Sequence, residues 1–103
     1  MSTNQFVTAI NCMDGRVQIP VIEYMKTTYD VEYIDMITEP GPIKTLSKNR
    51  DRMIVESIKT RVEMSVMKHN SKLIAIVGHN DCAGNPVDKG TQLNQIQSAI
   101  KIV

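Results

Sequence analysis

Two cysteines and one histidine carry the side chains of this sequence that are best suited to bind a transition metal. Cys12 follows one short apolar run, and His79 and Cys82 follow another, Leu73–Val77. Thiolate and imidazole ligands favour zinc, and three protein ligands with one open position are typical of a catalytic zinc site. These residue types therefore favour a zinc centre on Cys12, His79 and Cys82, provided that the fold brings the two segments together.

Other roles for these side chains stay open at this point. The two cysteines can be inert core residues, or they can form a disulfide, although disulfides are rare in chains without an export signal. Cys12 and His79 can instead form a thiolate–imidazolium nucleophile pair. The second histidine, His69, ends a long helical pattern at the opposite end of the third predicted strand from His79. We expect it to be a surface histidine rather than a ligand.

Asp14 and Arg16 follow Cys12 at alternate positions and form a second candidate group. An arginine beside an aspartate lowers the pKa of the carboxyl and keeps it ionised. Such a carboxylate can accept a hydrogen bond from a metal-bound water or bind the metal itself. Asp14, held by Arg16, is therefore a candidate for either of these two roles, the second being that of a fourth ligand. Gly78 and Gly84 would allow close backbone approach to a ligand.

The apolar periodicity predicts the elements that must position these residues. Short β-branched runs indicate strands, and apolar residues at helical spacing indicate helices. The expected strands are 5–11, 31–37 and 73–77, and the expected helices are about 19–29, 47–69 and 91–102, with loops at 38–42 and 78–86.

We infer an α/β fold from the alternation of these elements. It has three layers, with a small central parallel sheet in the order second, first, third strand and helices on both faces. The continuous apolar run 73–77 predicts a strand buried on both faces, and Leu93, Ile96 and Ile100 mark one apolar side of the last helix. Ligands of such sheets bind at the carboxyl ends of the strands, where both metal-binding segments would meet.

Length and composition restrict the class of protein. A chain of 103 residues supports one domain, 1–103. Its apolar runs are shorter than the about 20 residues of a membrane span, and its first residues lack signal-peptide features, so we expect a cytoplasmic protein. The net charge is +1, and acids are interleaved with the bases of 48–68, so we expect no nucleic-acid partner. A three-stranded sheet has open edges, which favours a homodimer or higher homo-oligomer.

The two candidate segments resemble the motifs of β-class carbonic anhydrases. The segment Cys-Met-Asp-Gly-Arg at 12–16 resembles their Cys-x-Asp-x-Arg motif, and Gly-His-Asn-Asp-Cys-Ala-Gly at 78–84 resembles their His-x-x-Cys motif. The resemblance implies Zn²⁺ on Cys12, His79 and Cys82. It also implies that Asp14 and Arg16 act as a dyad in the reversible hydration of CO₂ to bicarbonate.

The chain also departs from that family's pattern. The first strand begins almost at the N-terminus, Thr38–Pro42 stands where the family carries an Arg-Asn-Ala-Gly-like segment, and the chain stops at Val103 before a further family strand. We therefore expect a short, divergent member, short at its C-terminus. The alternative function is a non-catalytic zinc-binding domain for metal sensing or assembly.

Overall fold

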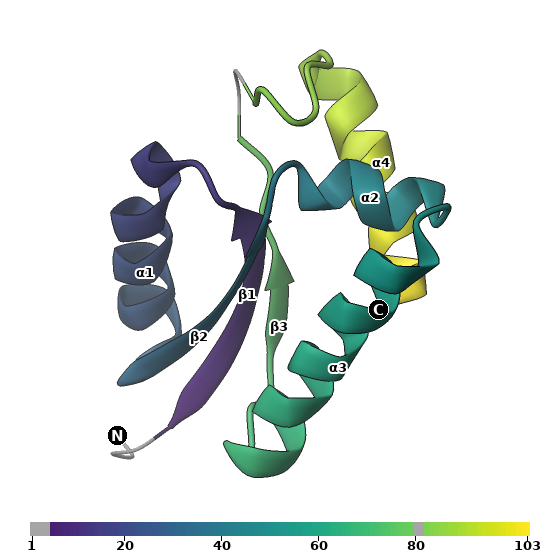
Figure 1. The fold of residues 1–103 in the computed structure, drawn as a ribbon. Helices are drawn as coiled ribbons and strands as arrows, with labels where there is room; N and C mark the ends of the chain where they lie inside the picture. The colour runs from purple at the N-terminus through teal and green to yellow at the C-terminus, as the bar shows by residue number, and fades with distance from the viewer. Residues whose placement is uncertain (1–4, 80–81) are drawn as a thin grey trace.

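The computed structural model describes residues 5–79 and 82–103. The described chain contains three strands and four helices (Figure 1). In chain order these are β1 (Phe6–Cys12), α1 (Gly15–Tyr29), β2 (Tyr33–Glu39), α2 (Pro42–Lys48), α3 (Arg52–Lys68), β3 (Ile74–Ile76) and α4 (Lys89–Ile102). All three strands are parallel and lie in the order β2-β1-β3. The expected α/β class and strand order are confirmed.

The sheet is the middle of three layers. Helix α1 covers one face, and α2, α3 and α4 lie on the other side (Figure 1). Val7 and Ala9 of β1 pack with Val21 and Met25 of α1. Because successive strand residues point to opposite faces, Ile10 joins the other core cluster, which α2, α3 and α4 complete.

The register of the sheet brings its carboxyl ends close together. Cys12 pairs with Glu39, so β1 and β2 end level with one another. On the other side of β1, Ile10 pairs with Ile76, and the backbone N–H of Val77 donates to the carbonyl of Ile10 at 2.9 Å. The chain after β3 therefore leaves the sheet beside the end of β1.

The prediction of one continuous helix over 47–69 is wrong. A short helix, α2, ends at Lys48, and Asn49 then adopts a left-handed conformation with φ of 50°. Its N–H donates to the carbonyl of Thr45, which closes α2. Asp51 starts α3 by accepting a hydrogen bond from the N–H of Ile54 at 3.3 Å. The left-handed residue turns the chain, so the two helices have separate axes.

The other boundaries move by a few residues because of helix caps. Helix α1 begins at Gly15 rather than near Ile19, since the carboxylate of Asp14 accepts from the N–H of Arg16 at 2.9 Å. Helix α4 begins at Lys89, because Asp88 caps it. Acidic side chains that cap helices in this way satisfy N–H groups that have no partner inside the helix.

The prediction that the third strand is buried on both faces is also wrong. Strand β3 is an edge strand, so its residues are only partly buried and Ile74 is exposed. Helix α4 turns its predicted apolar side outward: Leu93 is 53% exposed and Ile100 is 57% exposed, whereas Ala99 is buried. Within the described ranges, no helix combines the length and the apolar character needed to cross a membrane.

Candidate metal centre

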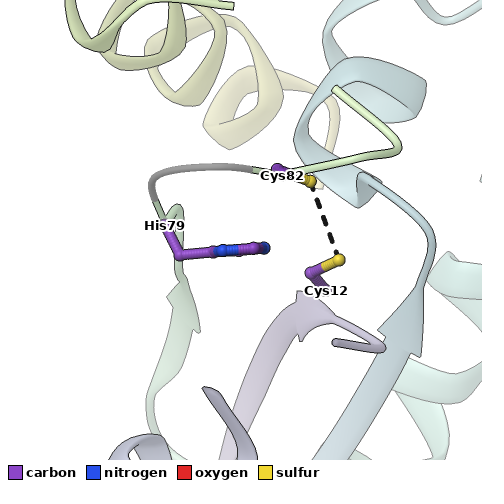
Figure 2. Close-up of side chains that lie close together, drawn as sticks. All are labelled: Cys12, His79 and Cys82. Carbon is purple, nitrogen blue, oxygen red and sulfur yellow. Dashed lines mark hydrogen bonds between the residues drawn. The ribbon is translucent and has the colours of Figure 1, made fainter. Parts of the chain in front are cut away.

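Three side chains converge at the carboxyl ends of β1 and β3. Cys12 is the last residue of β1, and His79 and Cys82 follow β3. The sulfur atoms of Cys12 and Cys82 lie 3.7 Å apart, and the ring of His79 points toward them (Figure 2). The ligand atoms of all three residues lie within 4.8 Å of one another. Asn80 and Asp81, which belong to the same sequence motif, lie outside the described residues.

This geometry fits a tetrahedral metal ion. Two thiolates on zinc, each about 2.3 Å from the ion, lie about 3.8 Å apart in a tetrahedral site. The sulfur–sulfur distance of 3.7 Å agrees with that value. It is much longer than a disulfide bond of about 2.05 Å, and both cysteines are free. A cavity of about 10 Å³ borders the three residues, which is room for about one water-sized atom.

The thiol of Cys12 is unusually acidic. Burial raises its pKa, but hydrogen bonds outweigh this effect and lower the pKa to about 7. They come from the backbone of Gly41 and Asp14 and from the side chains of His79 and Cys82. Cys12 is therefore the thiol that ionises near neutral pH.

The thiol of Cys82 shifts in the opposite direction. Burial raises its pKa, and the hydrogen bond to Cys12 and the charge of Cys12 raise it further. Backbone hydrogen bonds from Gly84 and Asn85 offset only part of this rise. Without a cation the pair therefore favours one negative charge, whereas a coordinating metal ion deprotonates a bound thiol.

Two glycines allow the loop after β2 and the loop that carries Cys82 to lie in close contact. Gly41 has a φ of +60°, and a Cβ added there would lie 2.7 Å from the backbone of Gly84. A Cβ added at Gly84 would lie 2.8 Å from the backbone of Pro40 and Gly41. The backbone at Gly84 therefore makes its close approach to the loop that contains Gly41. This contact holds Cys82 beside the loop whose N–H donates a hydrogen bond to Cys12.

Asp14 and Arg16 form the expected ion pair. The Nε of Arg16 donates to both oxygens of Asp14, at 3.0 and 3.1 Å. The side-chain and backbone hydrogen bonds from Arg16 hold the pKa of Asp14 well below its usual range, and the charge of His79 adds to this. Among the described residues, the potential ligand group contains Cys12, His79 and Cys82 and not the carboxylate of Asp14.

A family model described as "Putative carbonic anhydrase" matches residues 2–103. The chain belongs to this family. Comparisons with curated proteins and with solved structures found no match. The expected carbonic-anhydrase-like family is therefore confirmed, and the family's description agrees with a site of three potential metal ligands beside a paired aspartate.

In this member of the family, His69 lies apart from the three potential metal ligands. Its ring stacks on Phe6 with centroids 4.2 Å apart, and its Nδ1 lies 2.7 Å from the carboxylate of Asp35. Both partners belong to the opposite end of the sheet from Cys12. The metal-ligand group accordingly contains His79 and not His69.

Sequence reasoning missed four further residues that contact the potential ligands or the segment that carries them. Gly41 donates its N–H to Cys12, and Asn85 borders the cavity beside the ligands. Two side chains of α4 contact the segment that carries the ligands: Gln92 bonds to the carbonyl of His79, and Gln95 bonds to Asn85. Glycine and amide residues in loops and on a helix are common on any surface, so only the tertiary contacts identify them.

Proposed function

We propose that this chain is a zinc-dependent carbonic anhydrase of the β-class type, which converts CO₂ and water reversibly to bicarbonate and a proton. The observation that carries this proposal is the convergence of Cys12, His79 and Cys82 within 4.8 Å, in a chain of the carbonic anhydrase family. When bound, a zinc ion would lower the pKa of a coordinated water to about 7.

The protein's own residues then have distinct tasks. Cys12, His79 and Cys82 would hold the ion, and their two thiolates would give it more negative charge than three neutral histidines. Asp14 stays ionised because Arg16 binds it, so its carboxylate can accept a hydrogen bond from an O–H group at the site. Arg16 holds the carboxylate in place through two hydrogen-bonding nitrogens.

The decisive experiment is stopped-flow CO₂ hydration with the zinc-loaded full chain between pH 7 and 9. We expect hydration faster than in buffer alone, and we expect Cys12→Ser to abolish both this acceleration and stoichiometric zinc binding. His79→Ala should have the same effect. His69→Ala removes the distant histidine and serves as the matched control, which should keep zinc and activity. A zinc-loaded chain that does not accelerate hydration would contradict the enzymatic proposal.

A second function is favoured by the small size of the space beside the ligands. The cavity of about 10 Å³ that borders Cys12, His79 and Cys82 together has room for about one water-sized atom. In this alternative the chain is a non-catalytic zinc-binding domain for metal sensing or assembly. Zinc bound at one ion per chain, without any hydratase activity, would support the alternative over the enzyme.

We also propose that the chain forms a homodimer through the open edge of the sheet. Strand β3 is an edge strand, one apolar groove lies beside it, and a second lies beyond its carboxyl end. One groove of about 520 Å³ lies between α1 and β3, and the other is lined by Leu93 and Ile96 of α4. Light scattering after gel filtration should give twice 11.6 kDa, and a single species of 11.6 kDa would exclude the dimer.

The proposed location is the cytoplasm. Two thiolate ligands 3.7 Å apart persist as metal ligands only where they are not oxidised to a disulfide. Reducing compartments keep thiols in that state. Fractionation of the native cells, with detection of the chain by an antibody, tests this part of the proposal directly, and recovery only from an oxidising compartment would contradict it.

A further inference from the structure

We infer that helix α4 positions the metal centre through two glutamine side chains, Gln92 and Gln95. They hold the two ends of the segment that carries His79 and Cys82. This inference rests on the metal site of the proposed function, but it concerns residues outside the ligand set. Neither glutamine touches the ion or the substrate in this scheme, so both are positioning residues.

Gln92 holds the His79 end of the segment. Its Nε2 donates to the backbone carbonyl of His79 at 2.8 Å. The same side chain lies directly over Gly78, because a Cβ added to that glycine would be 2.7 Å from Oε1 of Gln92. Gln92 therefore fixes the backbone from which the imidazole ring extends, and the glycine leaves room for it.

Gln95 holds the Cys82 end through Asn85. The Nδ2 of Asn85 donates to Oε1 of Gln95 at 2.6 Å, and Asn85 is only 2% exposed. The backbone N–H of Asn85 donates to the carbonyl of Cys82 at 3.2 Å. Asn85 therefore connects the side chain of Gln95 to the backbone of Cys82.

The orientation of α4 supports this role. Gln92 and Gln95 are three residues apart and Ala99 follows one turn later, so the three share one helix face. Ala99 is fully buried and both glutamines are half-buried, whereas Leu93 and Ile100 are largely exposed. Ile102 of the same helix packs against the core, so α4 covers the core and also turns two amides inward. The inward position of these amides is explained by their hydrogen bonds to His79 and Asn85.

One substitution made at three positions of α4 tests the inference. Gln→Glu adds one negative charge at each position. The carboxylate keeps acceptor oxygens but loses the N–H donors of the amide. Gln92 acts as a donor, so Gln92→Glu loses its bond and places a carboxylate against the carbonyl of His79. Gln95 acts as an acceptor, so Gln95→Glu keeps its bond to Asn85. Gln97 is exposed and provides the matched control, Gln97→Glu.

The readouts are zinc affinity, by competition with a chromogenic chelator, and the absorption spectrum of the Co²⁺-loaded protein. Residues that orient metal ligands typically change metal affinity about 10- to 100-fold. We expect a loss in that range for Gln92→Glu, with a changed Co²⁺ spectrum. We expect Gln95→Glu to remain within about threefold of Gln97→Glu, and Gln95→Met, which loses the acceptor, to fall about tenfold. Melting of the metal-free variants separates loss of positioning from loss of folding.

Two results would count against these ideas, and they differ from one another. If the wild-type chain binds zinc and Gln92→Glu binds it as tightly as Gln97→Glu, the positioning role is wrong and the metal site stands. If the wild-type chain binds no zinc, the proposed function itself is wrong, and the inference falls with it. Should Gln92→Glu fail to fold without metal, the uncharged Gln92→Met replaces it, with the same expected loss of affinity.

Discussion

The contact between Gly41 and Gly84 should be one of the most sensitive points of this protein. In Gly41→Ala, the new side chain meets two separate penalties. A non-glycine residue in the left-handed region costs about 1–2 kcal/mol, and the φ of Gly41 is +60°. The new Cβ would also lie 2.7 Å from the backbone of Gly84, and overpacking of this kind costs about 1–3 kcal/mol. We expect a total loss of about 2–5 kcal/mol in unfolding free energy.

Gly84→Ala separates the two penalties. Its Cβ would approach the backbone of Gly41 at 2.8 Å, but Gly84 has no positive φ. We therefore expect only the packing penalty, about 1–3 kcal/mol. Two controls are available on helices. A Cβ at Gly15 meets nothing within 4 Å, and one at Gly90 comes no closer than 3.9 Å to Asp88. Alanine inside a helix is better than glycine by about 0.5–1 kcal/mol, so Gly90→Ala should stabilise.

Urea unfolding of the metal-free protein measures these differences in free energy. The alanine variants to compare are those at Gly41, Gly84, Gly15 and Gly90. For a domain of this size, each kcal/mol lowers the melting temperature by about 4–8 °C, so Gly41→Ala should melt at least about 8 °C below the wild type. The explanation is refuted if Gly41→Ala loses less than about 0.5 kcal/mol, which is the range of neutral surface changes. It is also refuted if Gly84→Ala is the more damaging of the two.

Three further predictions concern single side chains. The pKa of Cys12 is lowered to about 7 in the folded chain. The unfolding free energy of the metal-free protein should therefore rise from pH 7 to 9, and fall as the thiolate is protonated at lower pH. Urea titrations at each pH measure this change, and Cys12→Ser should show no such rise. Asp14→Asn keeps a helix-capping side chain but loses the charge, so CO₂ hydration should fall about 100-fold while zinc content, measured by metal analysis, is unchanged. Thr8→Val removes a buried hydroxyl that lies 2.7 Å from both Ser65 and Ser71, and thermal melting should show a loss of about 1–3 kcal/mol.

The general position of the site could be predicted from the sequence. Cys12 and His79 each follow a short apolar run, and parallel strands place their carboxyl ends at one edge. The strand order β2-β1-β3 then makes the two segments neighbours. Local side-chain patterns were enough for this step, because β-branched runs and caps such as Asp14 are encoded within a few residues of one another.

The break between α2 and α3 and the orientation of α4 could not be predicted in the same way. The break lies in the wholly polar stretch 47–52, which contains no glycine or proline to mark the end of a helix. The left-handed conformation of Asn49 ends α2 there. On α4, the apolar side marked by Leu93 and Ile100 is largely exposed. Gln92 and Gln95 turn inward because their hydrogen-bond partners, His79 and Asn85, lie elsewhere in the sequence. A pattern of hydrophobicity contains no information about such distant hydrogen bonds.

The two cysteines differ in acidity although their sulfur atoms are 3.7 Å apart, and this difference bears on how an ion would be held. Backbone donors reach both sulfurs, from Gly41 to Cys12 and from Gly84 to Cys82. These donors stabilise the thiolate of Cys12, and the negative charge of Cys12 then raises the pKa of Cys82. A divalent cation removes this conflict, since it attracts both charges at once. Two thiolates and one divalent ion sum to zero, so the centre can remain largely buried without an unpaired charge. The same glycine contact that brings the two donor loops together therefore favours a site that is complete only with its metal.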